Sequence, residues 1–508
     1  MSIARLATFA FSGIDTVPIE VQVQVASGLP AFIVVGLADK AVGESRERVR
    51  AALTGMGLAL PPKRVLVNLA PADIQKEGSH YDLPIALALL AAMGLVPAEE
   101  LAGFAALGEL ALDGAIGPVA GILPAALGAA SRGLGLICPE VQGAEATWAG
   151  EIELLAARDL PQLMGHLTGR RVLAVPPPPR LTAQRGQEAC LSEVRGQESG
   201  KRALEIAAAG RHNLLMIGPP GAGKSMLAAR LPGLLPDLTP REALEVSLVH
   251  SVAGLIEGGR ISARPPFRNP HHSASQAALV GGGPRARPGE ISLAHRGVLF
   301  LDELAEFPRP ALEALRQPLE SGECVIGRAA AHVTYPARVQ LIAAMNPCRC
   351  GHLGQASREC SKAPRCGETY QGRISGPLLD RMDMTLGLSP IPPGALARAP
   401  AGETTGAVAA RVKAARQRQV DRSMGATVTY NAEASLDQLM PELAPEALSL
   451  AERAAGQLGL SNRGFTRCIR VARSIADLGG DTRIGRGHMA EALSYRQRLD
   501  YVSGVAAE

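Results

Sequence analysis

The segment from residue 213 to residue 231 constrains the fold more than any other part of the chain. A short apolar run at 213–217 leads directly into a glycine-rich loop, and a run typical of a helix follows it at 226–231. The loop reads Gly218, Pro219, Pro220, Gly221, Ala222, Gly223, Lys224, Ser225. In this order of strand, loop and helix, main-chain N–H groups and a helix N-terminus converge on a phosphate. The sequence therefore predicts an α/β domain that binds a nucleoside triphosphate.

Four side chains are expected to act on that nucleotide and its metal ion. Lys224 is placed to reach the β- and γ-phosphates, and the Ser225 hydroxyl to ligate Mg²⁺. A second apolar run, at 297–301, ends in Asp302 and Glu303. A central strand delivers acids in this way at its carboxyl end. We expect Asp302 to hold the Mg²⁺ shell and Glu303 to polarise the attacking water.

A third apolar run, at 339–345, ends at Asn346. If this strand lies beside the acid-bearing one, the Asn346 amide would orient the water or sense the γ-phosphate. The alternative is an asparagine that caps the following turn.

Two proline-rich stretches, at 176–179 and 390–402, divide the 508-residue chain. The predicted parts are 1–170, a linker at 171–189, a core at 190–388, a linker at 389–404, and a helical part at 405–508. Hydrophobic residues make up 47% and charged residues 20%, which suffices for ordinary buried cores. Aromatic residues are only 3%, which argues against a reader of nucleic acids that stacks bases on a sheet.

Charge and cysteine usage bound the location and the partners. The formal net charge of +4 excludes a basic tail but allows a local basic channel. The longest apolar run, at 83–98, is interrupted by Pro84, Gly94 and Pro97, so we expect no membrane span. No signal peptide is evident at the start of the chain, and we expect a cytoplasmic protein with reduced cysteines.

Four further segments resemble the magnesium-chelatase-like AAA+ ATPases of the ComM (YifB) type. They are residues 194–198 (VRGQE), 267–272 (FRNPHH), 288–295 (PGEISLAH) and 374–381 (ISGPLLDR). The resemblance extends over essentially the whole chain. It implies a P-loop AAA+ core with a parallel sheet, a C-terminal helical lid domain, and a homo-hexameric ring with ATP bound between subunits.

The same resemblance implies roles for single residues. Asn346 is similar to sensor 1, Arg381 to the arginine finger that acts on a neighbour's nucleotide, and Arg463 to sensor 2. A guanidinium stabilises the charge that spreads over the transferred phosphoryl group. Arg381 could instead form a surface ion pair with Asp380 or Asp383, and two other arginines lie near Arg463 on the same predicted helix.

The first part resembles the Lon-protease-type domain, an α+β fold, but differs at both catalytic positions. His80, with Ser79 beside it, stands where that fold carries its nucleophile, and Leu123 stands where it carries the general-base lysine. A Ser–Lys dyad needs an amine within hydrogen-bond reach of the hydroxyl. We therefore expect a structural or docking domain without peptidase activity.

Residues 322–338 are typical of a β-hairpin inserted before the third strand. In related ring ATPases such a hairpin points into the pore, so Arg328 and His332 are expected near a DNA backbone. An exposed hairpin without a partner is the alternative. Residues 268–287 are a second candidate pore loop, and the basic helix at 406–422 is expected to be a solvated face.

The resemblance thus implies an ATP-driven motor on DNA, a branch-migration helicase that helps to integrate incoming single strands during transformation. One alternative is a motor subunit that drives metal insertion into a porphyrin. The other is a protein unfoldase or protease, which His80 and Leu123 disfavour.

A cysteine cluster follows Asn346 in a glycine-rich loop. Its members are Cys348, Cys350, Cys360 and Cys366. Four thiolates suit a tetrahedral Zn²⁺ site. In the family the second pair is usually also spaced by one residue, and here Lys362 stands at that position. His271, His272 and His352 are substitute ligands, and four reduced loop thiols are the alternative.

Overall fold

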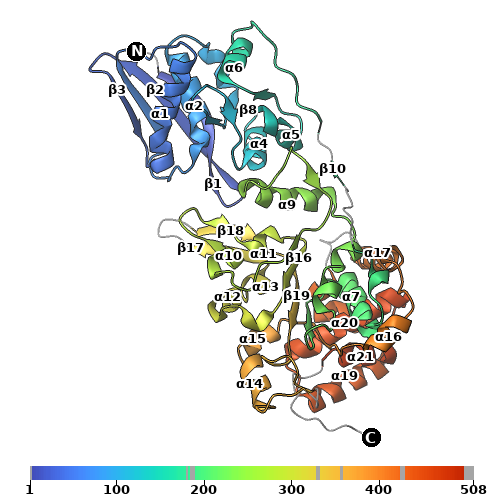
Figure 1. Ribbon diagram of the computed structural model, residues 1–508. Helices are drawn as coiled ribbons and strands as arrows, with labels where there is room; N and C mark the ends of the chain where they lie inside the picture. The colour runs from blue at the N-terminus through green and yellow to red at the C-terminus, as the bar shows by residue number, and fades with distance from the viewer. Residues whose placement is uncertain are drawn as a thin grey trace.

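The computed structural model describes residues 3–178, 181–182, 189–327, 332–354, 358–423 and 430–496. An N-terminal α/β part, a central parallel sheet and a C-terminal group of helices follow one another along the chain (Figure 1). Within these residues, no helix combines the length and the apolar character needed to cross a membrane.

The N-terminal part is built on a seven-stranded mixed sheet with the order β3-β4-β2-β1-β5-β8-β9. Its strands are β1 (Ile3–Ser12), β2 (Asp15–Ala26), β3 (Ala31–Val35), β4 (Arg64–Ala70), β5 (Phe104–Ala106), β8 (Gly135–Pro139) and β9 (Leu154–Ala157). Strand β2 pairs antiparallel with both β1 and β4, and it buries Ile19, Val21 and Val23. The alternation of apolar and polar residues in this stretch predicts such a half-buried strand.

Helices cover both faces of this sheet. One face packs against α1 (Lys40–Gly55), α2 (Asp82–Ala92) and α6 (Leu160–Leu167). The other face packs against α4 (Ile122–Ala130), around the side chain of Phe9. Residues 83–92 of the apolar run at 83–98 belong to the buried helix α2.

A five-stranded, fully parallel sheet with the order β13-β16-β19-β11-β20 forms the core of the middle part. Its strands are β11 (Leu214–Ile217), β13 (Phe267–Arg268), β16 (Val298–Leu301), β19 (Gln340–Met345) and β20 (Met384–Gly387). The three apolar runs found in the sequence form β11, β16 and β19, and each is buried along its whole length. A parallel sheet covered on both faces requires such continuous apolar strands.

The C-terminal helices pack against one face of this sheet through α7 (Glu198–Gly210). They are α17 (Thr405–Arg422), α18 (Leu436–Leu439), α19 (Pro445–Leu458), α20 (Asn462–Gly479) and α21 (Arg486–Ser494). After α21 the Tyr495 carbonyl accepts the Thr385 N–H at 2.8 Å, and Arg496 forms a β-bridge with Thr385 of strand β20. The predicted linker at 389–404 contains a short helix, α16 (Pro393–Arg398).

Helix α9 (Pro240–Val252) touches all three parts of the molecule. It follows the phosphate loop in sequence but packs on α4 of the N-terminal part, where Leu123 lies against Ala243 and Val246 (Figure 1). The Gly121 N–H donates to the Ser251 carbonyl at 3.0 Å. Toward the C-terminal helices, Glu242 of α9 accepts a hydrogen bond from the Tyr430 hydroxyl at 3.1 Å.

Candidate nucleotide-binding site

The glycine-rich loop lies at the carboxyl end of the central strand β11 and leads into α8 (Lys224–Ala228). Gly221 and Gly223 have φ angles of 78° and 87°, a region that glycine adopts without a steric penalty. The Lys224 ammonium donates to the main-chain oxygens of Gly218 and Pro219 at 2.6 and 3.0 Å. Burial lowers the pKa of Lys224, while the carboxylates of the neighbouring acids oppose that shift. The loop thus holds its lysine inward, against carbonyl oxygens that a phosphate would replace.

The hydroxyl and the carboxylate predicted to hold Mg²⁺ contact each other. Ser225 Oγ donates to Asp302 Oδ2 at 2.6 Å, and Asp302 lies directly after β16. The other Asp302 oxygen accepts the Glu303 N–H at 2.9 Å. Both groups are oxygen donors, and they would serve Mg²⁺ with water and phosphate oxygens completing its shell.

Glu303 has a φ of 53°, in the left-handed region that non-glycine residues rarely adopt. Backbone conformations of this kind cost about 1–3 kcal/mol and cluster at functional sites. The Glu303 side chain is exposed, and its Oε2 lies 2.9 Å from His272 Nδ1. His272 follows β13, the strand beside β16.

The sequence predicts a pore loop at 268–287 and a substitute zinc ligand in His272, and it does not predict the contact between His272 and Glu303. His272 lies against the candidate catalytic carboxylate instead. The short strand β13 precedes His272 and pairs parallel with β16, and this strand places His272 at the same edge of the sheet as Glu303.

Asn346 completes this edge from strand β19, which lies between β16 and β11. Its Oδ1 accepts a hydrogen bond from Lys224 at 3.1 Å. The three strand ends predicted from sequence thus bring Lys224, Asp302 and Asn346 to one place, with Ser225 and Glu303 beside them.

Arg381 and Arg463 lie together at the other end of the sheet. Arg381 follows α15 (Gly376–Leu379) and precedes β20, whereas the phosphate loop follows β11, which is parallel to β20. A four-residue strand spans about 13 Å, so Arg381 and its own loop lie at opposite ends of the sheet. Arg381 donates to the Arg316 and Pro377 carbonyls at 3.0 and 2.7 Å. These bonds hold its side chain on this far side.

One carboxylate, that of Glu320, accepts hydrogen bonds from both arginines. Arg381 Nη2 bonds to Glu320 Oε2, and Arg463 Nη2 bonds to Oε1 at 3.0 Å. Arg381 therefore pairs with Glu320 and not with Asp380 or Asp383, the partners considered from sequence. Nothing local in the sequence marks Glu320 as a shared partner.

These arginines line a cavity of about 610 Å³. Its charged residues are Arg211, Arg381, Arg463, Arg467, Arg470, Glu320, Asp383 and Glu433. Five cations against three carboxylates leave an excess of two positive charges, which suits a polyanion. Burial would raise the pKa of Asp383, but the nearby His212 and Arg467 side chains and the Asn213 N–H hold it at about 2.

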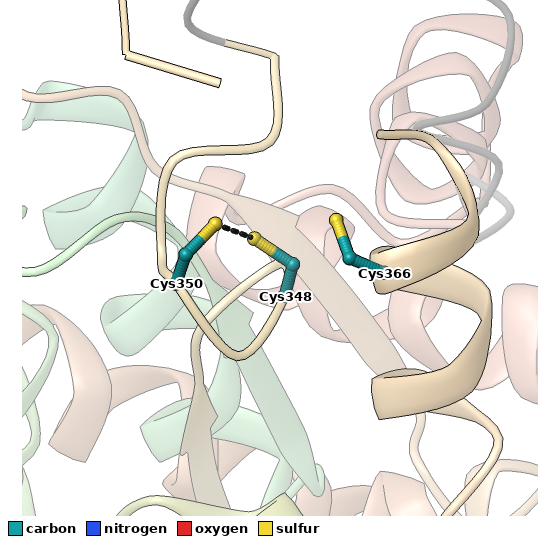
Figure 2. Close-up of side chains that lie close together, drawn as sticks. All are labelled: Cys348, Cys350 and Cys366. Atoms are coloured by element: carbon teal, nitrogen blue, oxygen red, sulfur yellow. Dashed lines mark hydrogen bonds between the residues drawn. The ribbon is translucent and has the colours of Figure 1, made fainter. Parts of the chain in front are cut away.

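The cysteine cluster begins two residues after Asn346 in the chain, and Figure 2 shows three of its members close together. Cys348 Sγ and Cys350 Sγ are 3.1 Å apart, and Cys366 points toward them from α14 (Arg365–Gln371). The three sulfurs all lie within 4.8 Å of one another. Cys360 is outside this group of three, but its thiol still interacts with Cys350 and Cys366. A main-chain hydrogen bond from His352 lowers the pKa of Cys350 to about 7.

The two positions at which a Lon-type domain carries its dyad are occupied by structural side chains. His80 is buried, its Nε2 lies 2.9 Å from the Phe9 carbonyl, and burial lowers its pKa to about 4. Ser79 bonds to the Glu109 carboxylate, and Leu123 is fully buried against α9. In the described part of the chain, no lysine bonds to Ser79 or His80.

The predicted hairpin is formed by β17 (Glu323–Gly327) and β18 (His332–Pro336). His332 is exposed at the start of β18, and Arg328 lies outside the described residues. The middle of strand β18 approaches the turn between β1 and β2, where a Cβ on Gly13 would meet the Thr334 carbonyl at 2.5 Å.

The basic helix α17 differs from its prediction as a solvated face. Arg411 bonds to Glu205 of α7 at 2.5 Å, Arg416 to the Ala208 carbonyl, and Arg422 to Asp477 of α20. Four of its five basic residues, Arg418 among them through the Asp477 carbonyl, bond to acceptors of α7 or α20, whereas Lys413 is exposed.

Three family models match consecutive parts of the chain. They are described as "Subunit ChlI of Mg-chelatase" at 21–142, "Magnesium chelatase, subunit ChlI" at 190–396, and "Magnesium chelatase, subunit ChlI C-terminal" at 402–496.

Similar proteins extend over nearly the whole chain. "Uncharacterized protein YifB" of Escherichia coli is 44% identical over 98% of this chain and 97% of its own. "Competence protein ComM" of Haemophilus influenzae is 42% identical over 98% of each chain. "Magnesium-chelatase 38 kDa subunit" of Rhodobacter capsulatus is 26% identical over 61% of this chain and 88% of its own. The chain therefore belongs to the magnesium chelatase subunit ChlI family, whose AAA+ members are ATPases, and within it resembles the YifB and ComM proteins across its full length.

Proposed function

We propose that this protein is a hexameric ATP-hydrolysing motor that moves along DNA as a branch-migration helicase and promotes the integration of single strands during transformation or recombination. The observation that carries the ATPase is the meeting of Lys224, Ser225, Asp302, Glu303 and Asn346 at one sheet edge. A cytoplasmic location belongs to this proposal, because ATP and chromosomal DNA are found there.

In this mechanism the loop amides bind the β-phosphate, and Lys224 leaves the Gly218 and Pro219 carbonyls to bind the β- and γ-phosphates. Glu303 polarises the attacking water, and His272 fixes its carboxylate in the resting site. Asn346 releases Lys224 and holds the γ-phosphate or the water. Mg²⁺, held by Ser225 and Asp302, would neutralise charge between the β- and γ-phosphates.

Arg381 and Arg463 are proposed to act on the nucleotide of the neighbouring subunit. Support comes from their position beyond the far end of the sheet and from the positive cavity that they line. A head-to-tail ring brings this surface of one subunit to the phosphate loop of the next. Arginines supplied in this way accelerate phosphoryl transfer by about 10³–10⁵.

The DNA part of the proposal rests on the full-length similarity to ComM, whose name assigns it to competence, the uptake of external DNA. The competing function is a motor subunit for metal insertion, which the Rhodobacter capsulatus relative favours. That relative shares 26% identity over 61% of this chain, against 42% over 98% for ComM. We therefore prefer the DNA motor.

The test is ATP hydrolysis and strand separation by the purified protein on forked and four-way DNA. We expect DNA to stimulate ATP hydrolysis, branch migration to require ATP, and both effects to weaken with salt. Glu303→Gln is the matched control, because it should bind ATP and DNA but neither hydrolyse ATP nor drive branch migration. ATP hydrolysis that ignores DNA and rises with a porphyrin-synthesis partner would favour the metal-insertion motor.

We also propose that the cysteine cluster binds Zn²⁺. Three sulfurs within 4.8 Å fit the edges of a tetrahedron with Zn–S bonds of about 2.3 Å, and Cys360 is near enough to become the fourth ligand. Metal analysis of the purified protein should find about one zinc per chain. Cys348→Ser should remove it, and equal zinc in that variant and in the parent would refute the site.

A further inference from the structure

The segment at 347–373 is rich in basic residues. It contains five basic residues and two acidic ones, which gives +3 of the total +4. The basic residues are Arg349, Arg358, Lys362, Arg365 and Arg373, and the acidic residues are Glu359 and Glu368. The segment is therefore basic, as are helix α17, with five basic residues and one acidic residue, and the first part of α20, with four basic residues and no acidic residue.

A cavity of about 890 Å³ opens in this segment beside the cysteine cluster. Four basic residues and no acidic residue line it: Arg349, Lys362, Arg365 and Arg373. Arg373 is held by the Ala305 carbonyl and by Glu306, both at 3.2 Å. The other three are exposed, and none of them forms an ion pair or a side-chain hydrogen bond with any residue in the described part of the structure. Three cations are thus available to a ligand.

The cavity lies next to the nucleotide site. Its loop begins two residues after Asn346 and passes so close to the phosphate loop that a Cβ on Gly351 would lie 2.5 Å from Pro220 Cδ. Any ligand in the cavity therefore sits beside the loop that would hold ATP, at the opposite end of the sheet from the cavity of Arg381.

We propose that this cavity binds the sugar–phosphate backbone of the DNA on which the motor acts. The proposal rests on the proposed function and adds a contact surface that is separate from the hairpin. Exposed arginine and lysine side chains that lack protein partners bind backbone phosphates regardless of sequence, which suits a protein that must move along DNA. A Zn²⁺ ion with four thiolates would add a charge of −2, and four basic side chains still leave the cavity positive.

The test compares the full-length protein with an Arg349→Ala/Lys362→Ala/Arg365→Ala variant in binding a fluorescent single-stranded oligonucleotide, by anisotropy at several salt concentrations. Three lost contacts should reduce the slope of log K against log salt by about 2, because each single-strand phosphate contributes about 0.7. Affinity at low salt should fall roughly tenfold or more. The matched control is Arg50→Ala/Lys63→Ala/Arg64→Ala, which removes three exposed basic residues of the N-terminal part.

The outcomes separate this inference from the proposed function. If the parent protein binds DNA and the cavity variant equals the control, the cavity is not the contact and the motor proposal stands. If the parent binds no DNA, both fail. Weakened binding of a fluorescent ATP analogue with unchanged DNA binding would assign the cavity to the nucleotide and overturn the inference. Arg365→Ala alone, at the exposed start of α14, repeats the test if the triple variant does not fold.

Discussion

The position of Arg381 predicts that two inactive variants restore each other. Arg381→Ala should lower ATP turnover by about 10³–10⁵, the contribution of an arginine in trans. Glu303→Gln should abolish turnover at its own site while it keeps Arg381 intact. If Arg381 serves the neighbouring subunit, an active interface needs Glu303 from an Arg381→Ala subunit and Arg381 from a Glu303→Gln subunit.

In a ring assembled at random from equal amounts, the subunit that carries the nucleotide is the Arg381→Ala variant half of the time. Its neighbour is the Glu303→Gln variant, which still carries Arg381, in half of those cases. About one quarter of the interfaces, and about one quarter of the parent's ATPase rate, should then return. The assay is phosphate release after the two proteins are mixed without nucleotide and diluted into ATP. If Arg381 acted within its own subunit, every interface would lack one group and the mixture would stay inactive, which would refute the reasoning.

Arg381 also makes structural contacts, so its variants need a stability control. The side chain is only 9% exposed, and its removal leaves the Arg316 and Pro377 carbonyls without this donor. Each lost partner costs about 1–3 kcal/mol where the group stays buried. Arg381→Lys keeps the charge beside Glu320 but not the planar fork of donors. It should fold like the parent and still lose most turnover.

Three further predictions concern other parts of the molecule. Lys224→Ala should abolish binding of a fluorescent ATP analogue, whereas Glu303→Gln should bind it and lose hydrolysis; full turnover in Glu303→Gln would exclude Glu303 as the group that polarises water. Burial holds His80 neutral with a pKa near 4, whereas the unfolded chain takes up the proton near pH 6.5. The free energy of unfolding should therefore be highest above pH 6.5 and fall by roughly 3 kcal/mol as the pH drops toward 4. Urea unfolding followed by the single tryptophan, Trp148, should show this loss, and His80→Gln should reduce it. Leu123→Lys should weaken docking of α9 and change the Trp148 fluorescence, without creating peptidase activity against a casein substrate, because His80 occupies the nucleophile position.

The part of the site that could be predicted from sequence is the part that local patterns encode. Two apolar runs are followed by the polar residues Asp302 and Asn346, and a third is followed by the loop that ends in Ser225. Each run predicts a buried strand with polar residues at its carboxyl end. A parallel sheet brings such ends to one edge. The structure brings Lys224, Ser225, Asp302, Glu303 and Asn346 together there.

Contacts between segments that are distant in sequence could not be predicted in this way. Glu320 is an ordinary exposed acid near the end of a short helix, and its two arginine partners are 61 and 143 residues away. The inward orientation of α17 depends on acceptors in α7 and α20, so the helix alone looks like a charged surface. His272 is 31 residues from Glu303, and only the order of the strands makes them neighbours.

Helix α9 gives the protein a mechanical connection between its domains. On the side of the N-terminal part it packs against Leu123 and accepts the Gly121 N–H at the Ser251 carbonyl. On the side of the C-terminal helices its Glu242 accepts a hydrogen bond from Tyr430. A rotation of the lid during ATP turnover would pull on one end of this rod and tilt the N-terminal domain at the other. In the proposed motor, the N-terminal part would in this way move with every cycle of ATP hydrolysis.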